Sequence, residues 1–409
     1  AAAPADRIVH VSAMAMNRYF ADLHIHIGRT ESGAPVKISG SRDLTFYNIA
    51  KEAEERKGIE LIGIIDCHSP AVQEEMERYL HSGEMVEQEG GGIRYKRTTI
   101  ILGSEIEVKE PGMGTVHLLV FMPTFAAMRQ LTEWMRPHMT NIQLSSQRLY
   151  VPARTLQAEI VARGGLLVPA HIFTPYKSLY GSGTDRLSNL LDSDGVAAVE
   201  LGLSADTEMA SLLSELDRYT FLTNSDAHSL GKIGREYNVL ELREPSFAEL
   251  ALALARKEGR RVAANYGLNP RLGKYHRTYC AACESIVDEE GVAVERCPYC
   301  GSGKIVRGVM DRIRSIADRE TARPAGHHPP YHFQVPLPFL PGVGAKTLRL
   351  LLDKFGTEMN VLHRVSSEQL REVAGEPIAE AIMRARAGTL NVEAGGGGRY
   401  GKIIAEQTP

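Results

Sequence analysis

Five short segments of the chain place metal-binding side chains where a hydrophobic run ends. They are Asp22-Leu23-His24-Ile25-His26, Asp66-Cys67-His68, Glu105, His171 and Asp226-Ala227-His228. Imidazole and carboxylate groups are common ligands of zinc and manganese, and such ions lower the pKa of a water that they hold to near neutrality. One such segment carries little information, but an ordered series from residue 22 to residue 228 indicates a site for several ions. The series therefore predicts metal-dependent hydrolysis.

The spacing within two of these segments supports a shared ion. His24 and His26 are separated by one residue, and side chains alternate along an extended strand, so both imidazoles project to the same side. Asp22, two residues earlier, is expected either to bind the ion or to orient an imidazole. Asp226 and His228 repeat the same spacing at the far end of the series.

The remaining candidates differ in how firmly the pattern assigns them. Glu105 closes an apolar strand, where an unpaired carboxylate would be unfavourable, and His171 follows the apolar run LLVPA. His117 opens its strand instead of closing it. Glu200 has two interpretations, a carboxylate that orients a ligand or a carboxylate of the barrel core. Cys67 is expected to be a small buried residue and not a ligand.

Composition limits the classes of protein that fit. With 409 residues, two or three domains are expected, and 43% hydrophobic with 24% charged residues is ordinary for a soluble protein. A net charge of -3 gives no global attraction to nucleic acid, so DNA binding would need a local patch. No run of about twenty apolar residues is present, which argues against a membrane span. Residues 1–16 do not resemble a signal peptide and are expected to be a tail.

Apolar runs alternate with helical patterns between residues 18 and 242. The runs 61–65, 99–103, 116–121, 165–170, 196–201 and 219–224 are predicted to be buried parallel strands, and the stretches 44–56, 156–163, 208–218 and 247–258 to be helices. Repeated strand–helix units with ligands beyond the strand ends favour a barrel whose active site lies at the carboxyl ends of the strands. Residues 137–150 interrupt this pattern as a polar insertion.

Four of the five cysteines form a metal-binding pattern. Cys280, Cys283, Cys297 and Cys300 have the C-x2-C…C-x2-C spacing of a tetrahedral zinc site, which leaves no open position and is therefore structural. Free thiols at this spacing favour a reducing cytoplasm. The flank of this module is either a solvated surface or a contact for phosphates and bases. Its residues are Arg271, Lys274, Tyr275, His276, Arg277 and Tyr279.

A Pro- and His-rich stretch, residues 323–338, predicts a domain junction before a helical C-terminal part. There a helix, the turn Pro341-Gly342-Val343-Gly344 and a second helix resemble the helix-hairpin-helix DNA-binding element. Backbone N–H groups at such a turn can meet a phosphate oxygen, and Lys346 and Thr347 would add a charge and a hydroxyl. The alternative is an ordinary tight turn between packed helices.

The motifs DLHIH, IDCHS, SEIE, HLLVF, PAHIF and NSDAHS, in this order, resemble the polymerase-and-histidinol-phosphatase (PHP) superfamily. The resemblance implies an α/β fold, a distorted (β/α)7 barrel that holds three metal ions. By this resemblance the first ion binds His24, His26, Glu105 and Asp226; the second shares Glu105 and adds His117 and His171; the third binds His68 and His228, with Asp66 or solvent. Many members place a further His after the first motif, where this chain has GRTESG.

The order of modules from Tyr19 to Lys402 is similar to that of the endonuclease Q family. The resemblance implies four parts: a tail (1–16), a PHP barrel (17–268), a zinc module (269–322) and a helix-hairpin-helix-like domain (323–409). It implies hydrolysis of the phosphodiester on the 5′ side of deaminated bases (hypoxanthine, uracil, xanthine) or abasic sites, leaving 3′-hydroxyl and 5′-phosphate ends. Asp226, Glu105 and His228 would carry the catalysis.

These resemblances set the expected cofactors and partners. We expect one structural Zn²⁺ and two to three catalytic divalent ions, Zn²⁺ with Mn²⁺ or Mg²⁺ as alternatives. Damaged DNA is the expected partner of a cytoplasmic, nucleoid-associated protein, and a sliding clamp or other repair partner stays open. The candidate DNA contacts are Arg29, Lys37, Arg148, Lys274, Arg277, Gly342, Gly344, Lys346 and Thr347. Two alternatives remain: a histidinol-phosphate-type phosphatase and a noncatalytic DNA-binding scaffold.

Overall fold

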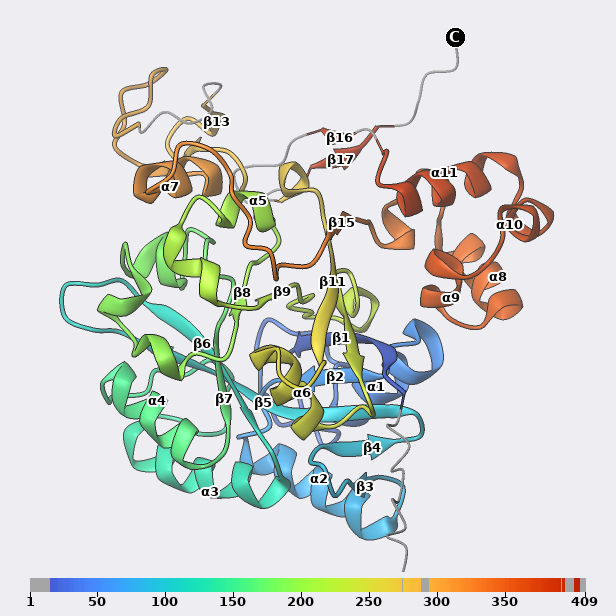
Figure 1. The fold of residues 1–409 in the computed structure, drawn as a ribbon, viewed down its shortest axis with the longest axis horizontal. Coiled ribbons are helices and arrows are strands. Elements are labelled where there is room, and N and C mark those ends of the chain that lie inside the picture. The colour runs from blue at the N-terminus through green and yellow to red at the C-terminus, as the bar shows by residue number, and fades with distance from the viewer. Residues whose placement is uncertain (1–14, 274, 288–293, 391, 394–400, 405–409) are drawn as a thin grey trace, which may run out of the picture.

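The computed structural model describes residues 15–273, 275–287, 294–390, 392–393 and 401–404. Its largest element is a ten-stranded sheet in the order β15-β11-β10-β1-β2-β5-β4-β3, with β6 and β7 continuing from β5 (Figure 1). The strands are β1 (Asn17–Ile25), β2 (Leu61–Ile64), β3 (Val86–Glu87), β4 (Ile93–Tyr95), β5 (Thr98–Val108), β6 (Val116–Met122), β7 (Leu166–Pro169), β10 (Tyr237–Leu242), β11 (Arg261–Gly267) and β15 (Tyr331–Phe333). A separate parallel pair is formed by β8 (Val199–Glu200) and β9 (Phe221–Leu222).

The sheet is mixed, so the prediction of parallel strands throughout was wrong. Strands β1, β2 and β5 are parallel, but β6 is antiparallel to β5 and β7 is antiparallel to β6. The short connection 109–115 leaves no room for a crossover helix, and consecutive strands joined so tightly must pair antiparallel. The runs 196–201 and 219–224 are strands only at β8 and β9.

Helices cover the barrel, and their ends follow from local sequence. They are α1 (Phe46–Glu52), α2 (Pro70–Ser82), α3 (Phe125–Met135), α4 (Ala153–Ala162), α5 (Thr207–Ala210) and α6 (Phe247–Ala255). Thr45, Thr124 and Ser246 each accept a backbone N–H in the first turn of the helix that follows, as N-caps do. The stretch 208–218 is not one helix, because α5 is followed by a separate 3-10 segment, Ser214–Arg218.

The topology gathers the ligand candidates at one end of the barrel. His24 lies at the carboxyl end of β1, Asp66 follows β2, and His171 follows β7. Glu105 lies within the longer β5, and Asp226 follows β9. The carboxyl ends of parallel strands share one edge of a sheet, so residues from distant parts of the chain meet there.

Two smaller parts are attached to the barrel (Figure 1). The first, the zinc module, has a three-stranded sheet of β12 (Tyr279–Cys280), β13 (Ser285–Ile286) and β14 (Ile305–Val306), followed by α7 (Val309–Ile316). The second contains α8 (Ala345–Phe355), α9 (Glu358–His363), α10 (Ser367–Ala374), α11 (Glu376–Ala387) and the paired strands β16 (Val392–Glu393) and β17 (Lys402–Ile403). The predicted junction 323–338 is more than a tether, because β15 within it pairs with β11 of the barrel.

A buried ion pair fixes the C-terminal helices to the barrel. Lys57, after α1, pairs with Glu358 at the start of α9, and both side chains are almost fully buried. The Lys57 ammonium also donates to the Gly231 carbonyl at 2.9 Å. Nearby, the Tyr237 hydroxyl donates to Gln334 and contacts the His363 ring. Among the described residues, no helix is long and apolar enough to cross a membrane.

Substitution of Glu358 tests this attachment. Glu358→Ala leaves the buried Lys57 ammonium without its carboxylate, so the free energy of unfolding should fall by roughly 3–5 kcal/mol in urea denaturation. The exposed Glu372→Ala on α10 serves as control and should change it by less than about 0.5 kcal/mol. An equal effect of both substitutions would show that the pair does not hold the two parts together.

Candidate metal centre

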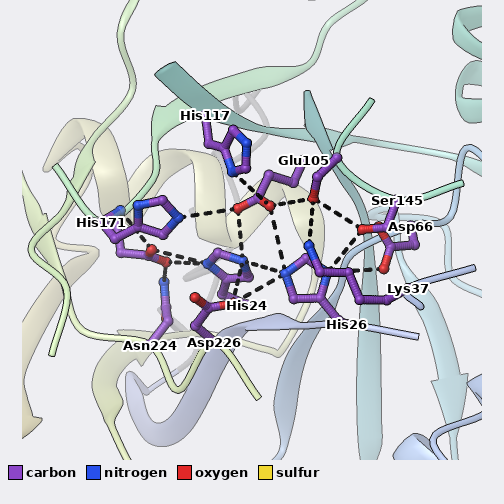
Figure 2. A network of polar contacts seen from close by, with 12 residues as sticks. His24, His26, Lys37, Asp66, Glu105, His117, Ser145, His171, Asn224 and Asp226 are labelled. Atoms are coloured by element: carbon purple, nitrogen blue, oxygen red, sulfur yellow. Dashed lines mark hydrogen bonds and ion pairs between the residues drawn. The ribbon is translucent and has the colours of Figure 1, made fainter. Parts of the chain in front are cut away.

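The two histidines of β1 form the centre of the first ligand group (Figure 2). The Nε2 atoms of His24 and His26 lie 3.1 Å apart, and Oδ1 of Asp226 lies 3.2 Å from each of them. Oε2 of Glu105 lies 3.2 Å from Nε2 of His24. Ligands at about 2.1 Å from one ion lie about 3.0–3.4 Å apart, so Asp226 and Glu105 each lie at a suitable distance from an imidazole of this pair.

Glu105 also belongs to a second group. Its Oε1 lies 3.1 Å from Nδ1 of His117, and its Oε2 lies 3.5 Å from Nε2 of His171. Glu105, His117 and His171 each offer one ligand atom, and these three atoms lie within 4.8 Å of one another. His117, which the sequence pattern left least certain, is therefore brought to the site from β6. A carboxylate has two oxygens and can bridge two ions, and Figure 2 shows Glu105 between the two sets of rings.

A third group lies towards the solvent. His26, Asp226 and His228 place ligand atoms within 4.8 Å of one another, and Nε2 of His228 lies 3.4 Å from Oδ1 of Asp226. The His228 side chain is 41% exposed, whereas those of His24 and His26 are buried. His228 therefore lies at the open side of the cluster.

The structure does not support His68 as a ligand. Its Nε2 lies 3.0 Å from the Leu144 carbonyl, to which it must donate, and its Nδ1 accepts from the Ser104 hydroxyl at 2.7 Å. Burial lowers the pKa of His68, in keeping with this neutral ring, and no lone pair is left for a metal. His68 therefore lies outside the ligand groups of the described residues, which the predicted pairing with His228 at a third ion did not anticipate.

Asp66 contacts a ligand and lies outside the ligand groups. Its Oδ2 lies 3.0 Å from Nδ1 of His26 and accepts from the Ile27 amide at 3.1 Å. This contact fixes the His26 ring so that Nε2 faces the ion position. Asp66 thus orients a ligand, while its Oδ1 is buried without a hydrogen-bond partner among the described residues, and its predicted role at the third ion stays a prediction.

Carboxylates also contact the rings of His24 and His117. Glu200 lies 2.9 Å from Nδ1 of His24 and accepts from the Asn224 side chain at 2.8 Å, so the first of its two interpretations is supported. Oε1 of Glu107 lies 3.3 Å from Nε2 of His117. Asp22 instead accepts the backbone amides of Ser225 and Gly234, and it contacts no imidazole of the described residues. Sequence reasoning missed Asn224 and Glu107, although both lie within two residues of a recognised ligand.

The polar insertion supplies two further contacts that were not predicted. Ser146 donates to Oε1 of Glu105 at 2.5 Å, and the Ser145 hydroxyl lies 3.2 Å from Nδ1 of His26. The sequence showed that residues 137–150 interrupt the strand–helix pattern, but it did not show which residues this insertion contacts. The insertion closes over the carboxylate that both groups share.

Burial and neighbouring charges oppose each other in the cluster. Burial alone would raise the pKa of Glu105, but His117, His171 and His24 hold it well below its usual range. Burial alone would lower the pKa of His26, but the Asp66 and Asp226 carboxylates raise it to about 9. Positive charge is therefore strongly favoured between these side chains.

Strained backbone accompanies the ligands. His171, Asp226 and Asp66 have positive φ angles of 28°, 48° and 79°, and Ser146 has 54°. Non-glycine residues rarely adopt this region, and it persists where the surroundings require it. The strain turns these side chains towards the cluster.

The residues present fit divalent ions. Oε2 of Glu105 and Oδ1 of Asp226 are buried and accept no hydrogen bond from the described residues, although histidine nitrogens surround both. Such oxygens are costly to bury unless a cation binds them. We propose His24, His26, Glu105 and Asp226 as ligands of one ion, Glu105, His117 and His171 as ligands of a second, and His228 as a ligand at the outer position.

The cluster forms the floor of a cavity of about 490 Å³. Four cationic side chains line its walls: Lys37, Lys177, Lys232 and Arg235. Tyr176 of the barrel and Tyr275 of the zinc module also line it, with ring centroids 5.9 Å apart and planes at 78°. The zinc module therefore contributes a wall of the cavity.

The predicted DNA contacts fall in different environments. Lys37 lines the cavity and donates to Ser146 at 3.0 Å. Arg148 pairs with Glu107 at 2.8 Å, and Arg277 donates to the Val287 carbonyl, so both have roles within the protein. Arg29 is half-buried, and Lys274 lies outside the described residues.

The glycine turn of the C-terminal part is exposed. Gly342 has φ 85°, and Gly344 forms the N-cap of α8 without a side-chain cap. Lys346 is exposed and Thr347 partly exposed in the first turn of α8. Before the turn there is a short 3-10 segment, Leu337–Phe339, so the predicted first helix of the hairpin is not an α-helix.

The four cysteines of the zinc module converge. The Sγ atoms of Cys280 and Cys300 lie 3.7 Å apart, and those of Cys283 and Cys297 lie 3.6 Å apart. Sulfurs at about 2.3 Å from one tetrahedral zinc are separated by about 3.8 Å. The thiols form no disulfide, and their arrangement fits a structural zinc ion.

The barrel and its ligand cluster define a metal-dependent phosphoesterase of the PHP type, and residues 208–268 match the family model described as PHP-associated. The chain is 52% identical to the uncharacterized protein YqxK of Bacillus subtilis, over 95% of this chain and all of that protein. The lesion-specific endonuclease PfuEndoQ from Pyrococcus furiosus has a crystal structure that matches 95% of both chains with 32% identity and a TM-score of 0.81.

A crystal structure of endonuclease Q with a 27-mer duplex carrying an abasic lesion at the active site also matches. It is 32% identical, covers 96% of this chain and 97% of that chain, and gives a TM-score of 0.80. The chain belongs to the endonuclease Q family, whose members are metal-dependent DNA endonucleases of the PHP superfamily.

Elemental analysis tests the zinc module. Protein purified without added metal should retain one zinc per chain through mild chelation, because four thiolates hold it. Cys297→Ser should lose this zinc and lower the melting temperature, since structural zinc contributes directly to folding. The control is Cys67→Ala, because the Cys67 thiol lies outside the ligand groups of the described residues. This variant should keep the zinc. A variant Cys297→Ser with full zinc content would contradict the assignment.

The raised pKa of His26 predicts a pH dependence of the metal-free protein. Protonation of this ring stabilises the folded protein, because the ring holds its proton more tightly there than in the unfolded chain. The contribution is complete below about pH 6.5, the pKa of the ring in the unfolded chain, and it is lost as pH rises through about 9, the pKa in the folded protein. The free energy of unfolding should therefore fall by on the order of 3 kcal/mol over that window. Saturating zinc should remove the decline, because it binds the neutral ring. A flat profile without metal would refute the charge assignment.

Proposed function

We propose that the chain is a lesion-specific DNA repair endonuclease. The observation that carries the proposal is the ligand cluster on the floor of a cavity walled by four cationic side chains and by Tyr275 of the zinc module. The P. furiosus relative is described as lesion-specific, and the complex with an abasic duplex places the lesion at that enzyme's active site. A shared fold over 95% of both chains supports the same kind of substrate here.

The proposed reaction is hydrolysis of one phosphodiester bond on the 5′ side of the damaged nucleotide. Water adds to phosphorus, the bond to the 3′-oxygen breaks, and the ends are a 3′-hydroxyl and a 5′-phosphate. Divalent ions, when bound, neutralise phosphate charge and lower the pKa of a water. Glu105 and Asp226 supply the negative charge that holds these ions. Lys37 and Lys177, on the cavity wall, bind nonbridging oxygens.

The proposed lesions are deaminated bases (hypoxanthine, uracil, xanthine) and abasic sites. A base that is read at its edge must leave the stack, and mispaired or missing bases are the least costly to displace. Tyr176 and Tyr275 on the cavity wall offer aromatic faces to a displaced base. The cavity is thus suited to one extruded nucleotide, with its phosphate towards the ligand cluster.

A small-molecule phosphatase of the histidinol-phosphate type would use the same ligand groups. It would have no use for the exposed glycine turn before α8 or for a cavity wall taken from a zinc module. A noncatalytic scaffold would not need two complete ligand groups around Glu105. Both alternatives are therefore less well supported than the endonuclease.

A cleavage assay separates the three functions. With added divalent metal, wild type should nick a duplex with one deoxyinosine once, immediately 5′ to the lesion, and leave an undamaged duplex and histidinol phosphate unchanged. Asp226→Asn keeps the shape but removes charge from the first ion site, so cleavage should fall by about 100-fold or more while DNA binding persists. The exposed Asp353→Asn on α8 is the matched control. Equal cutting of undamaged DNA would refute lesion specificity.

The exposed turn before α8 predicts a phosphate contact. Lys346→Ala should weaken DNA binding equally for damaged and undamaged duplexes and reduce the slope of log affinity against log salt by about 1. Lys354→Ala, exposed at the other end of α8, should leave the slope unchanged. Fluorescence anisotropy at several salt concentrations measures both. Identical slopes for wild type and Lys346→Ala would assign the turn to packing alone.

A further inference from the structure

One apolar side chain projects into solvent directly after a residue that lines the metal cavity. Ile38 is 80% exposed, the largest value for any large apolar side chain among the described residues. It directly follows Lys37, which lines the cavity. An isolated exposed isoleucine is unremarkable on most surfaces, but this one lies beside a site that must accept a nucleotide.

The turn that presents Ile38 is held from both sides. The amide of Gly40 donates to the Lys37 carbonyl at 2.9 Å, which closes the turn with Ile38 at its tip. The amide of Ser41 donates to the carbonyl of His228 at 3.0 Å. On the other side the Val36 carbonyl accepts from the Ser145 amide at 2.9 Å. The turn is therefore tied to a segment bearing a metal ligand and to the polar insertion.

Close backbone packing makes the turn rigid. A Cβ atom on Gly40 would lie 2.8 Å from Cα of Gly28, and one on Gly28 would lie 2.2 Å from the Ser41 carbonyl oxygen. Both distances are too short for a real contact, so only glycine permits the two segments to approach. Ile38 is thus displayed at a fixed distance from the cavity.

We propose that Ile38 is the wedge that enters the base stack and fills the space left by the extruded nucleotide. This inference rests on the proposed function and names the residue that separates the displaced nucleotide from the duplex. Proteins that unstack DNA commonly insert an apolar side chain at the step that opens. Ile38 is a positioning residue, since it acts on the duplex and not on the reacting phosphate.

The test compares a paired with an already opened lesion. Two duplexes of the same sequence carry one deoxyinosine, either in a fully paired strand or inside a short unpaired bubble. Ile38→Ala should lower single-turnover cleavage of the paired substrate by about tenfold or more, and cleavage of the bubble by less than about twofold, because the bubble needs no wedge. Ile38→Leu should restore the paired reaction. Val86→Ala, 47% exposed on β3, is the control for losing a surface side chain.

Each result decides the question. The wedge is supported if Ile38→Ala loses cleavage of the paired duplex only and Ile38→Leu restores it. Equal loss on both substrates, or no loss on either, overturns it while the proposed function stands. Wild type that cuts neither substrate would overturn the proposed function, and the wedge with it.

Discussion

The carboxylate of Glu105 is the interaction on which the site depends. It is buried in β5. Its Oε1 lies near His117, and its Oε2 lies near both His24 and His171, so imidazoles of both ligand groups reach it. An ionised carboxylate at this depth is unfavourable unless positive charge surrounds it. The long strand β5, the antiparallel return through β6 and the hydroxyl of Ser146 all serve to place this one group. Two ligand groups can then share it.

The two appended parts are each in contact with the barrel that carries the cluster. Tyr275 brings the zinc module to the cavity wall, and the Lys57–Glu358 pair fixes the C-terminal helices against the barrel. Both parts therefore contact the barrel that carries the ligand cluster, and in the proposed function they supply its contacts to DNA.

Much of the site could be predicted from the sequence, because the spacing of ligands and their position at the end of a strand can both be read from a few neighbouring residues. His24 and His26 alternate along one strand, and four cysteines carry their spacing in the chain itself. Non-local contacts were beyond reach. Nothing near His68 indicates that Ser104 and Leu144 occupy both of its nitrogens. Burial alone also does not encode strand direction, so β6 was assigned the wrong direction, and the pairing of β15 with β11 was not foreseen.

Anomalous diffraction from crystals of the metal-loaded protein, recorded at the absorption edge of the bound metal, tests the central claim directly. Around Glu105 the account predicts two peaks, each within ligand distance of this carboxylate, apart from the zinc of the four cysteines and any ion at the outer position of His228. One should lie at about 2.0–2.2 Å from Nε2 of His24 and His26, and the other at that distance from Nδ1 of His117 and Nε2 of His171. No peak should lie at His68. Peaks that Glu105 does not contact would contradict the shared carboxylate, and a peak bound by His68 would contradict the exclusion of that ring.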